Sequence, residues 1–367
     1  MRIVLTGGVS GGHIIPLIAV ANKIREKEPE AEFLFIGPRK KMEEDMMSAA
    51  QIPIKGISTG KMRRYFSWLN FLDIFRIPWG IAQSLWLLLW YMPDVIFSKG
   101  GAASLPVVLV GWLYRIPIMI HESDANPGLA NSMLAKFSTR VAVSYPSAEV
   151  YFPAEQVVLT GAPLRSDINQ GEAQKAREKF SLTESKKVIF VWGGSQGAQV
   201  INNKLLDILP DLLHKYQVIH QTGAANYETV VRLAAEYGIK AGREGYHPIA
   251  FIGEELKDIL AVSDIIISRA GNSSISEIAA NGKPSIIIPI EHSANGHQRM
   301  NAYAVAKVGG CIVLEENNLG NNMLKAKIDE IADDEALSAK LGTNIKNFFY
   351  HPDAVDRIVE GILGIVK

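Results

Sequence analysis

The chain has 367 residues, of which 48% are apolar and 21% charged, with 38 basic and 38 acidic side chains. This composition is typical of folded globular domains and excludes a largely disordered chain. A net charge of zero argues against nucleic acid as the main partner, because phosphate binding usually requires a basic excess. The single cysteine, Cys311, excludes a disulfide framework and a zinc knuckle, and it fits a reducing, intracellular location.

The first residues, Met1 and Arg2, lead directly into an apolar run that predicts a strand, so we expect no secretory signal. The one membrane-like segment, residues 77–91, is shorter than the roughly 20 apolar residues that a spanning helix requires. Pro78, Gln83 and Ser84 also interrupt it. We therefore expect this segment not to cross a membrane.

Short β-branched runs alternate with longer amphipathic stretches along most of the chain. Gly, Pro, Ser or Asn bounds each run. This alternation predicts parallel β-sheets covered by helices, an α/β fold. The expected strands are residues 3–6, 32–36, 95–98, 116–121, 140–143, 157–160, 188–192, 216–221, 249–252, 265–268, 285–289 and 311–314.

Two similar strand–loop–helix units lie about half a chain apart. The first passes from residues 3–6 into a glycine loop, and the second does so from residues 188–192. This repetition predicts two α/β domains, 1–163 and 164–343, with the boundary near residues 161–165. Ligands of such sheets bind at the carboxyl ends of strands, so we expect functional residues in the strand-exit loops.

The first glycine loop places Ser10, Gly11 and Gly12 before His13, with a helix expected to begin near residue 14 and Pro16 in its first turn. Glycine allows close approach of a ligand, and free N–H groups at a helix start can bind an anion or a sugar hydroxyl. The spacing fits neither GxGxxG nor a Walker loop. The positive helix end favours a neutral His13, which could act as a general base. A tight turn and a packed or capping histidine are the structural alternatives.

Two further loops in the second half suit an anionic ligand. Ser195 lies in the second glycine loop, and residues 269–274 precede another helix. Ser273, Ser274 or Ser276 could cap that helix. Glu277 could then accept hydrogen bonds from a ribose diol, or it could simply complement the helix dipole.

Three more polar residues lie in loops or near the domain boundary. Arg165 could pair with a diphosphate or be an ordinary surface arginine. Gln298 carries both donor and acceptor groups, which suits sugar hydroxyls. Asp124 belongs to a polar stretch, 121–126, at another strand exit, where capping is the alternative role.

The sequence contains no D-x-D triplet of the kind that holds a nucleotide diphosphate through a divalent cation. Helix N-termini and Arg165 would then have to balance the diphosphate charge. His292 and His297 lack a third ligand at a recognisable spacing. We expect no metal site and no cofactor.

Taken together and in order, these loops resemble the MurG family of UDP-N-acetylglucosamine transferases. The resemblance extends from about residue 1 to residue 345. The matching strings are GGVSGGHIIPLIAVA (7–21), FSKGGAASLPVVLV (97–110), HESDANPGLANSMLAKFSTRV (121–141), TGAPLR (160–165), VWGGSQGAQVIN (191–202), HQTG (220–223), DIIISRAGNSSISEIAANGKPSIIIP (264–289) and HQRMNA (297–302).

The resemblance implies a GT-B fold, with two Rossmann-like domains whose parallel sheets face a central cleft. It also implies that a last helix, about residues 344–367, crosses back to the first domain. The implied reaction is inverting transfer of GlcNAc from UDP-GlcNAc to the C4 hydroxyl of lipid I, a muramyl-pentapeptide on undecaprenyl diphosphate. The product would be lipid II, a precursor of peptidoglycan.

By position, the resemblance makes His13 the base for that hydroxyl. Ile252 corresponds to the residue whose backbone holds uracil, Glu277 to the ribose-binding acid and Gln298 to a donor-sugar contact. The other implied substrate contacts are Ser10, Gly11, Gly12, Asp124, Arg165, Ser195, Asn272, Ser273 and Ser274. Ser10 replaces the usual threonine and keeps its hydroxyl, whereas Asp124 replaces an asparagine and cannot donate as an amide does.

A lipid acceptor makes the apolar segment before residue 91 relevant. Tryptophan favours the headgroup zone and basic side chains attract anionic lipids, so this region predicts contact with the cytoplasmic face of the cell membrane. A buried helix on the first sheet is the structural alternative. The residues concerned are Trp68, Trp79, Trp86, Trp90, Lys61, Arg63, Arg64 and Arg76.

Two other functions remain open from the sequence. One is transfer from a UDP-sugar to another lipid acceptor, such as diacylglycerol. The other is a homologue that binds a UDP-sugar without catalysis. The presence of both His13 and Glu277 favours catalysis.

Overall fold

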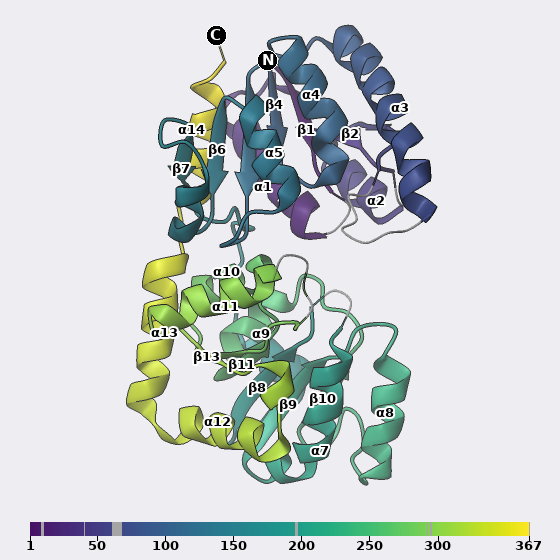
Figure 1. Cartoon of the computed structure of the whole chain (residues 1–367). Coiled ribbons are helices and arrows are strands. Elements are labelled where there is room, and N and C mark those ends of the chain that lie inside the picture. The colour runs from purple at the N-terminus through teal and green to yellow at the C-terminus, as the bar shows by residue number, and fades with distance from the viewer. Residues whose placement is uncertain are drawn as a thin grey trace. The chain divides into compact units, whose positions relative to one another are not determined.

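The computed structural model describes residues 1–8, 11–39, 41–60, 68–194, 197–291, 293 and 296–366, with the backbone alone at 11, 42, 43, 68–75 and 321. The chain divides into two compact units (Figure 1). The first unit comprises Met1–Arg165 and His351–Lys367, and the second comprises Ser166–Tyr350. The division thus falls after residue 165 rather than 163, and the chain returns to the first unit at 351 rather than 344.

The first unit is built on a parallel sheet of seven strands in the order β3-β2-β1-β4-β5-β6-β7. Its central strands β4 and β5 are mostly apolar and are buried on both faces, as expected for a parallel sheet. The strands are β1 (Arg2–Thr6), β2 (Glu32–Gly37), β3 (Ile54–Gly56), β4 (Val95–Ser98), β5 (Ile118–Glu122), β6 (Arg140–Val143) and β7 (Val157–Leu159).

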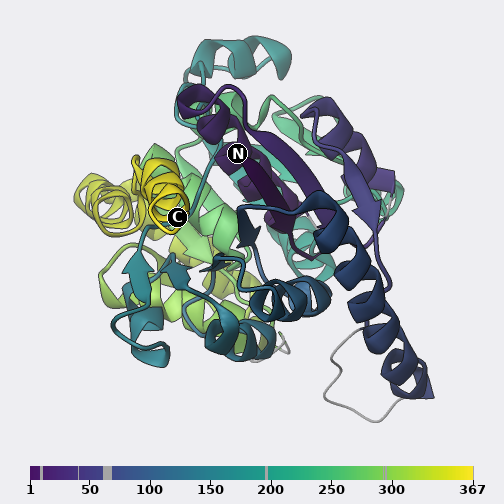
Figure 2. The same cartoon turned by 90° about the horizontal axis from the view of Figure 1, so that it is seen from above.

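Helices cover both faces of this sheet. On one face, Ile14 and Leu17 of α1 are buried in one core with Ile3, Phe97 and Ile358. On the other face, Gly111 of α4 lies against Ile96, and α3 lies beside α4, as Figure 2 shows. The helices are α1 (Gly11–Lys27), α2 (Lys41–Ala49), α3 (Trp68–Tyr91), α4 (Leu105–Leu113), α5 (Leu129–Leu134) and α14 (Ala354–Leu363).

The second unit has a parallel sheet of six strands in the order β10-β9-β8-β11-β12-β13. Its strands are β8 (Lys187–Trp192), β9 (Tyr216–Gln221), β10 (Tyr246–Ile249), β11 (Ile265–Ser268), β12 (Ser285–Ile287) and β13 (Ile312–Val313). Its helices are α6 (Ala173–Lys179), α7 (Gln199–Lys215), α8 (Tyr227–Glu236), α9 (Leu256–Val262), α10 (Asn272–Asn281), α11 (His297–Lys307), α12 (Asn321–Asp333) and α13 (Glu335–Phe349).

The core of the second unit follows the helical period of α7. Ile201, Leu205 and Leu209 of α7 are buried in one cluster with Ile189 of β8 and Ile267 of β11. Positions four residues apart lie on one face of a helix, so α7 covers the sheet along this stripe.

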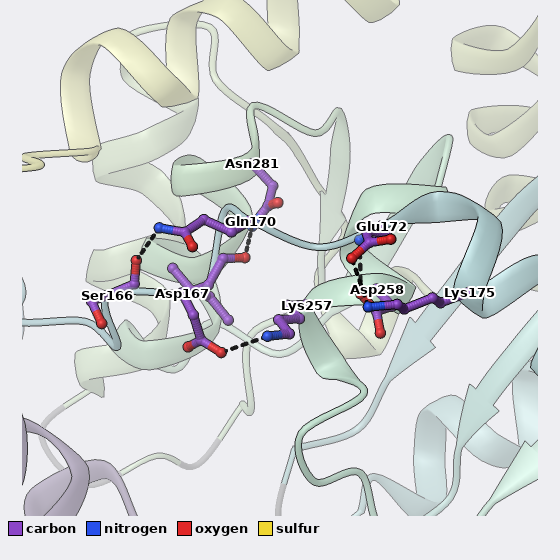
Figure 3. A network of polar contacts seen from close by, with 9 residues as sticks. Ser166, Asp167, Gln170, Glu172, Lys175, Lys257, Asp258 and Asn281 are labelled. Carbon is purple, nitrogen blue, oxygen red and sulfur yellow. Dashed lines mark hydrogen bonds and ion pairs between the residues drawn. The ribbon is translucent and has the colours of Figure 1, made fainter.

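The start of the second unit is tied down immediately after the boundary (Figure 3). Lys257 Nζ donates to Asp167 at 2.9 Å, and the Asn281 amide donates to the carbonyl of Ile168 at 3.1 Å. The Glu172 N–H donates to Asp258 at 2.7 Å. Because these bonds hold the segment to α9 and α10, it belongs to the second unit from Ser166 onward.

The C-terminal helix expected over 344–367 is wrong as a single element. α13 ends at Phe349 and α14 begins at Ala354. Pro352 lies between them, and proline has no N–H for the helical ladder and disfavours a helical conformation at the preceding residue. The change of unit at His351 falls in this break.

Other element boundaries also differ from the predictions. α1 begins at Gly11, so Pro16 is the sixth helical residue and not in the first turn. The strand expected at 249–252 is β10, Tyr246–Ile249, and β3 was not expected. β10 contains Pro248, which has no N–H to donate. An edge strand tolerates proline because only one of its sides pairs with another strand.

Candidate active site

In the first unit, the strand order reverses between β1 and β4, and the expected site loops follow these strands. β1 pairs with β2 on one side and with β4 on the other. Ligands of doubly wound sheets bind beside such a reversal. The loop after β1 leads into α1, and the loop after β4 contains Gly100 and Gly101, which both have positive φ.

His13 is the third residue of α1, and its ring packs on glycine backbones. A Cβ atom at Gly8 would lie 3.3 Å from His13 Cε1, and one at Gly101 would lie 3.6 Å from it. The Gly8 N–H donates to His13 Nδ1 at 3.4 Å. Since Nδ1 accepts this bond, the hydrogen bond assigns the proton of the neutral ring to Nε2.

The His13 imidazole is neutral at pH 7. Burial of the ring, and after it the positive charge of Lys99, lower the pKa of His13 to about 4. Loss of hydration disfavours the charged ring, and a nearby positive charge opposes protonation. A general base must be neutral, and the His13 ring is. The main cause of its lowered pKa is burial, whereas the sequence alone predicted a neutral ring from the helix terminus.

Lys99 is a buried charged residue of this region that its local sequence does not reveal. It follows β4 directly and is only 3% exposed. Its Nζ lies 2.5 Å from His121 Nδ1 and donates to Ser123 Oγ. A lysine at a strand exit is usually solvated, and only the pairing of β4 with β5 brings it beside His121.

Asp124 lies in a turn after β5 that the Glu122 side chain organises. The two carboxylate oxygens of Glu122 accept from the Asp124 N–H at 2.9 Å, from the Gly128 N–H at 3.2 Å and from the Asn131 amide at 2.9 Å. The side chain of Asp124 is partly exposed. Its contact with a substrate remains a prediction.

In the second unit, the strand order reverses between β8 and β11. The loop after β11 leads into α10, which begins at Asn272. Glu277 is the sixth residue of this helix and is only 8% exposed. The structure therefore places Glu277 within one to two turns of a helix N-terminus at the end of a central strand, and its contact with a ribose stays a prediction.

The expected capping serines of α10 do not cap it. Its N-cap residue is Gly271, and none of the side chains that the structure describes makes the capping hydrogen bond. The Ser276 hydroxyl instead donates to the Asn272 side chain at 3.4 Å. The hydroxyls of Ser273 and Ser274 make no capping hydrogen bond at this helix start within the described structure. Ser273 is exposed and Ser274 is partly exposed.

Gln298 and Ile252 also lie at the carboxyl side of the second sheet. Gln298 is the second residue of α11, and its amide oxygen accepts from the Ile290 N–H at 3.1 Å. The Asn301 amide holds α11 to the β11–α10 turn through the carbonyl of Ala270 at 3.2 Å. Ile252 lies three residues beyond β10, in a stretch without regular structure.

Arg165 is the last residue of the first unit, whereas the other residues expected to hold the donor lie in the second. Its Nε is buried and has no hydrogen-bond partner among the described residues. Gly11 and Gly12 open α1. Ser10, Ser195 and His292 lie outside the described residues.

In the described ranges, no group of three or more His, Cys, Asp or Glu side chains is arranged to hold a metal ion. Arg269, the residue that follows β11, is already paired. Its guanidinium donates to Glu316 at 2.5 Å and to the carbonyl of Ile288 at 3.1 Å. The buried ion pair therefore holds the end of β11 in place.

The chain matches two family descriptions, one within the first unit and one that covers most of the second unit and the start of the returning C-terminal segment. Residues 3–143 match the glycosyltransferase family 28 N-terminal domain, and residues 188–358 match the glycosyltransferase family 28 C-terminal domain. A solved structure of Acinetobacter baumannii MurG is similar over 99% of both chains, with a TM-score of 0.77 and 22% identity. These matches and the two parallel sheets define a GT-B glycosyltransferase of family 28, which confirms the predicted fold class.

Curated relatives narrow the class further. The chain is 36% identical over 332 residues, 90% of its length, to the UDP-N-acetylglucosamine–N-acetylmuramyl-(pentapeptide) pyrophosphoryl-undecaprenol N-acetylglucosamine transferase 2 of Bacillus anthracis, of which this covers 91%. It is 35% identical to the Bacillus cereus protein of the same name over 98% of this chain and 99% of that one. The chain belongs to the MurG family, as its motifs predicted.

Proposed function

We propose that this protein transfers GlcNAc from UDP-GlcNAc to the C4 hydroxyl of lipid I, giving lipid II with inversion at the anomeric carbon. The observation that carries the proposal is the match to MurG enzymes along nine-tenths or more of both chains. The neutral imidazole at the strand-order reversal of the first unit and the buried Glu277 at that of the second support it.

In the proposed reaction, the acceptor oxygen attacks the anomeric carbon of GlcNAc. The hydroxyl proton passes to His13, and the bond between the sugar and the diphosphate breaks with its electron pair on UDP. Nδ1 of the free ring already accepts the Gly8 N–H. The acceptor hydroxyl therefore displaces this N–H, or the ring moves its proton to Nδ1 and accepts at Nε2.

On the donor side, we propose that the Glu277 carboxylate accepts from the ribose hydroxyls and that the open start of α10 binds the diphosphate. Asn272, Ser273 and Ser274 form that start, where backbone N–H groups lack helical partners. Ile252 and Gln298 would contact uracil and the sugar.

A transfer assay tests this function. We would mix the purified protein with UDP-[¹⁴C]GlcNAc and lipid I and follow label in the lipid phase, with diacylglycerol as a second acceptor. We expect labelled lipid II and no labelled diacylglycerol. Binding of UDP-GlcNAc by calorimetry without transfer to lipid I would reject the proposal and favour the non-catalytic homologue. Transfer to diacylglycerol alone would favour another lipid acceptor.

We further propose that the first unit docks on the cytoplasmic face of the membrane. None of the described helices is long and apolar enough to span a bilayer. α3 instead turns Gly80, Ser84 and Leu88 inward and leaves Trp79, Trp86 and Trp90 63%, 71% and 65% exposed.

The neighbouring helix α4 extends this apolar surface. Trp112 and Leu113 at its end are 54% and 60% exposed, and the Tyr114 hydroxyl donates to the carbonyl of Leu85 in α3 at 3.2 Å. Exposed Arg76 and Arg115 accompany these side chains and would attract anionic lipid. Lys61, Arg63 and Arg64 lie outside the described residues, and the side chain of Trp68 is likewise not described.

Vesicle sedimentation tests the docking. Burial of a large apolar side chain contributes about 1.5–3 kcal/mol, so we expect Trp86→Ser to weaken binding to phosphatidylglycerol-containing vesicles about tenfold or more. Tyr237→Ser, at an exposed aromatic of the second unit, is the matched control and should bind as the wild type does. Equal binding by all three proteins would reject this surface.

A further inference from the structure

The buried ammonium of Lys99 has a fixed set of partners. The Nε2–H of His121 donates to the carbonyl of Gly161 at 3.1 Å, so the lone pair of Nδ1 faces Lys99 Nζ at 2.5 Å. Ser123 Oγ accepts from the same ammonium. A buried ammonium is costly unless it is hydrogen-bonded, and these contacts join the ends of β4 and β5 around it.

Lys99 is also the neighbour of His13. The Lys99 N–H donates to the carbonyl of Thr6 at 2.9 Å, so the two strand exits lie side by side. A Cβ atom at Gly7 would lie 3.3 Å from Lys99 Cβ and 3.7 Å from His13 Cβ. Glycines at 7, 8, 100 and 101 put no side chain between the ammonium and the imidazole.

The other ionisable groups of this region come from β5 and the turn after it. Burial lowers the pKa of Lys99 to about 8, while the negative charges of Glu122 and Asp124 oppose this change. Burial, and then Lys99, keep the pKa of His121 well below its usual range. At pH 7, Lys99 is therefore a positive charge that opposes protonation of His13, and the two carboxylates help to retain it.

We propose that Lys99 is a positioning residue for the transfer reaction, whose buried positive charge disfavours protonation of the neighbouring His13 imidazole and whose hydrogen bonds hold the loops after β4 and β5. The proposal rests on the proposed role of His13 as the base. A purely structural role would need the hydrogen bonds but not the charge.

Titration of His13 by NMR separates these roles without using activity. Protein labelled with ¹³C,¹⁵N-histidine would be titrated between pH 3 and 9, so that the range includes the His13 pKa of about 4, with His13→Asn used to assign the signal. We expect Lys99→Met to raise the proton affinity of His13 about tenfold. The charge of Lys99 is, after burial, the second cause that lowers the pKa of His13, and a neighbouring charge commonly shifts a pKa by about 1–3 units.

Two control variants isolate the charge. Ser123→Ala removes one hydrogen bond of Lys99 and keeps its charge, so His13 should titrate within about twofold of the wild type. Lys283 is a lysine of the second unit whose pKa is also lowered by burial. Lys283→Met should leave the His13 titration unchanged. An unchanged His13 titration in Lys99→Met, or an equal change in Ser123→Ala, would overturn the proposal.

The wild-type protein gives a second test if Lys99→Met fails to fold. Loss of the Lys99 proton should produce an inflection near pH 8 in the ring signals of His13, and its absence would also overturn the proposal. The activity result is separate. A shifted His13 titration with no loss of turnover at pH 5 would uphold the charge effect of Lys99 and count against His13 as the base.

Discussion

The lowered pKa of His13 makes a quantitative prediction about activity in acid. A general base must be neutral in the free enzyme, and a pKa of about 4 keeps the neutral form down to unusually low pH. At pH 5, about 90% of such rings are neutral, against about 3% for an ordinary histidine. We therefore expect kcat/KM for lipid I at pH 5 to remain near its value at pH 7.5, about 30-fold above what an unperturbed base would allow.

The assay is the pH profile of kcat/KM with UDP-GlcNAc saturating and lipid I limiting. Tryptophan fluorescence would check that the protein stays folded, since five of the six tryptophans lie in the first unit. The kcat/KM of His13→Gln should be lower by about 10²–10⁴-fold, and its pH profile should lack the decrease in acid that protonation of His13 causes. Burial is the main cause of the lowered His13 pKa, and salt screens charges but does not change burial. Raising KCl from 0.05 to 0.5 M should therefore change the pH at which wild-type kcat/KM decreases in acid only slightly.

Two results would refute this reasoning. One is a wild-type acid limb near pH 6.5 that disappears in His13→Gln, because His13 would then be the base with an ordinary pKa. The other is a His13→Gln enzyme with nearly wild-type kcat, because His13 would then not take the proton at all.

Three further predictions concern the donor, the diphosphate and the packing of α3. Glu277→Ala should raise KM for UDP-GlcNAc about 10–100-fold through loss of charge-assisted hydrogen bonds. Glu330→Ala, at an exposed glutamate of the same unit, is the control and should leave this KM unchanged. A Glu277→Ala enzyme with unchanged KM and kcat would exclude the ribose contact. Because the sequence lacks a D-x-D triplet, we propose that no metal holds the diphosphate, and EDTA should leave initial rates of transfer unchanged. Gly80→Ala directs a Cβ atom onto the carbonyl oxygen of Ser58 and should lower the free energy of unfolding in urea by about 1–3 kcal/mol. Gly128→Ala is the control, because its Cβ atom would meet no atom of the described residues within 4 Å, and it should leave this free energy unchanged.

Much of the fold was predictable because its signals are local. β-branched runs with glycine exits predict central strands such as β1, β4 and β8, and these lie within a residue of their expected positions. The errors lie where local signals are weak. β3 has only three residues, and two of them are exposed, so it lacks the apolar run that predicts a strand. β10 contains Pro248, which argues against a central strand, so its N-terminal residues were not predicted as a strand.

The site was predictable only in part, because its electrostatics depend on contacts between distant residues. The glycine loop identifies His13 as a residue at a helix start, and a helix terminus contributes about 0.3–1 kcal/mol at exposed sites and up to about 2 kcal/mol at partly buried ones. Since one pKa unit corresponds to about 1.36 kcal/mol, the terminus alone would not lower this pKa to about 4. The lower value comes from burial of the ring and from Lys99, which is 86 residues away in sequence and brought close by the pairing of β1 with β4. A tertiary arrangement, rather than the loop motif, therefore makes His13 a neutral acceptor of a proton.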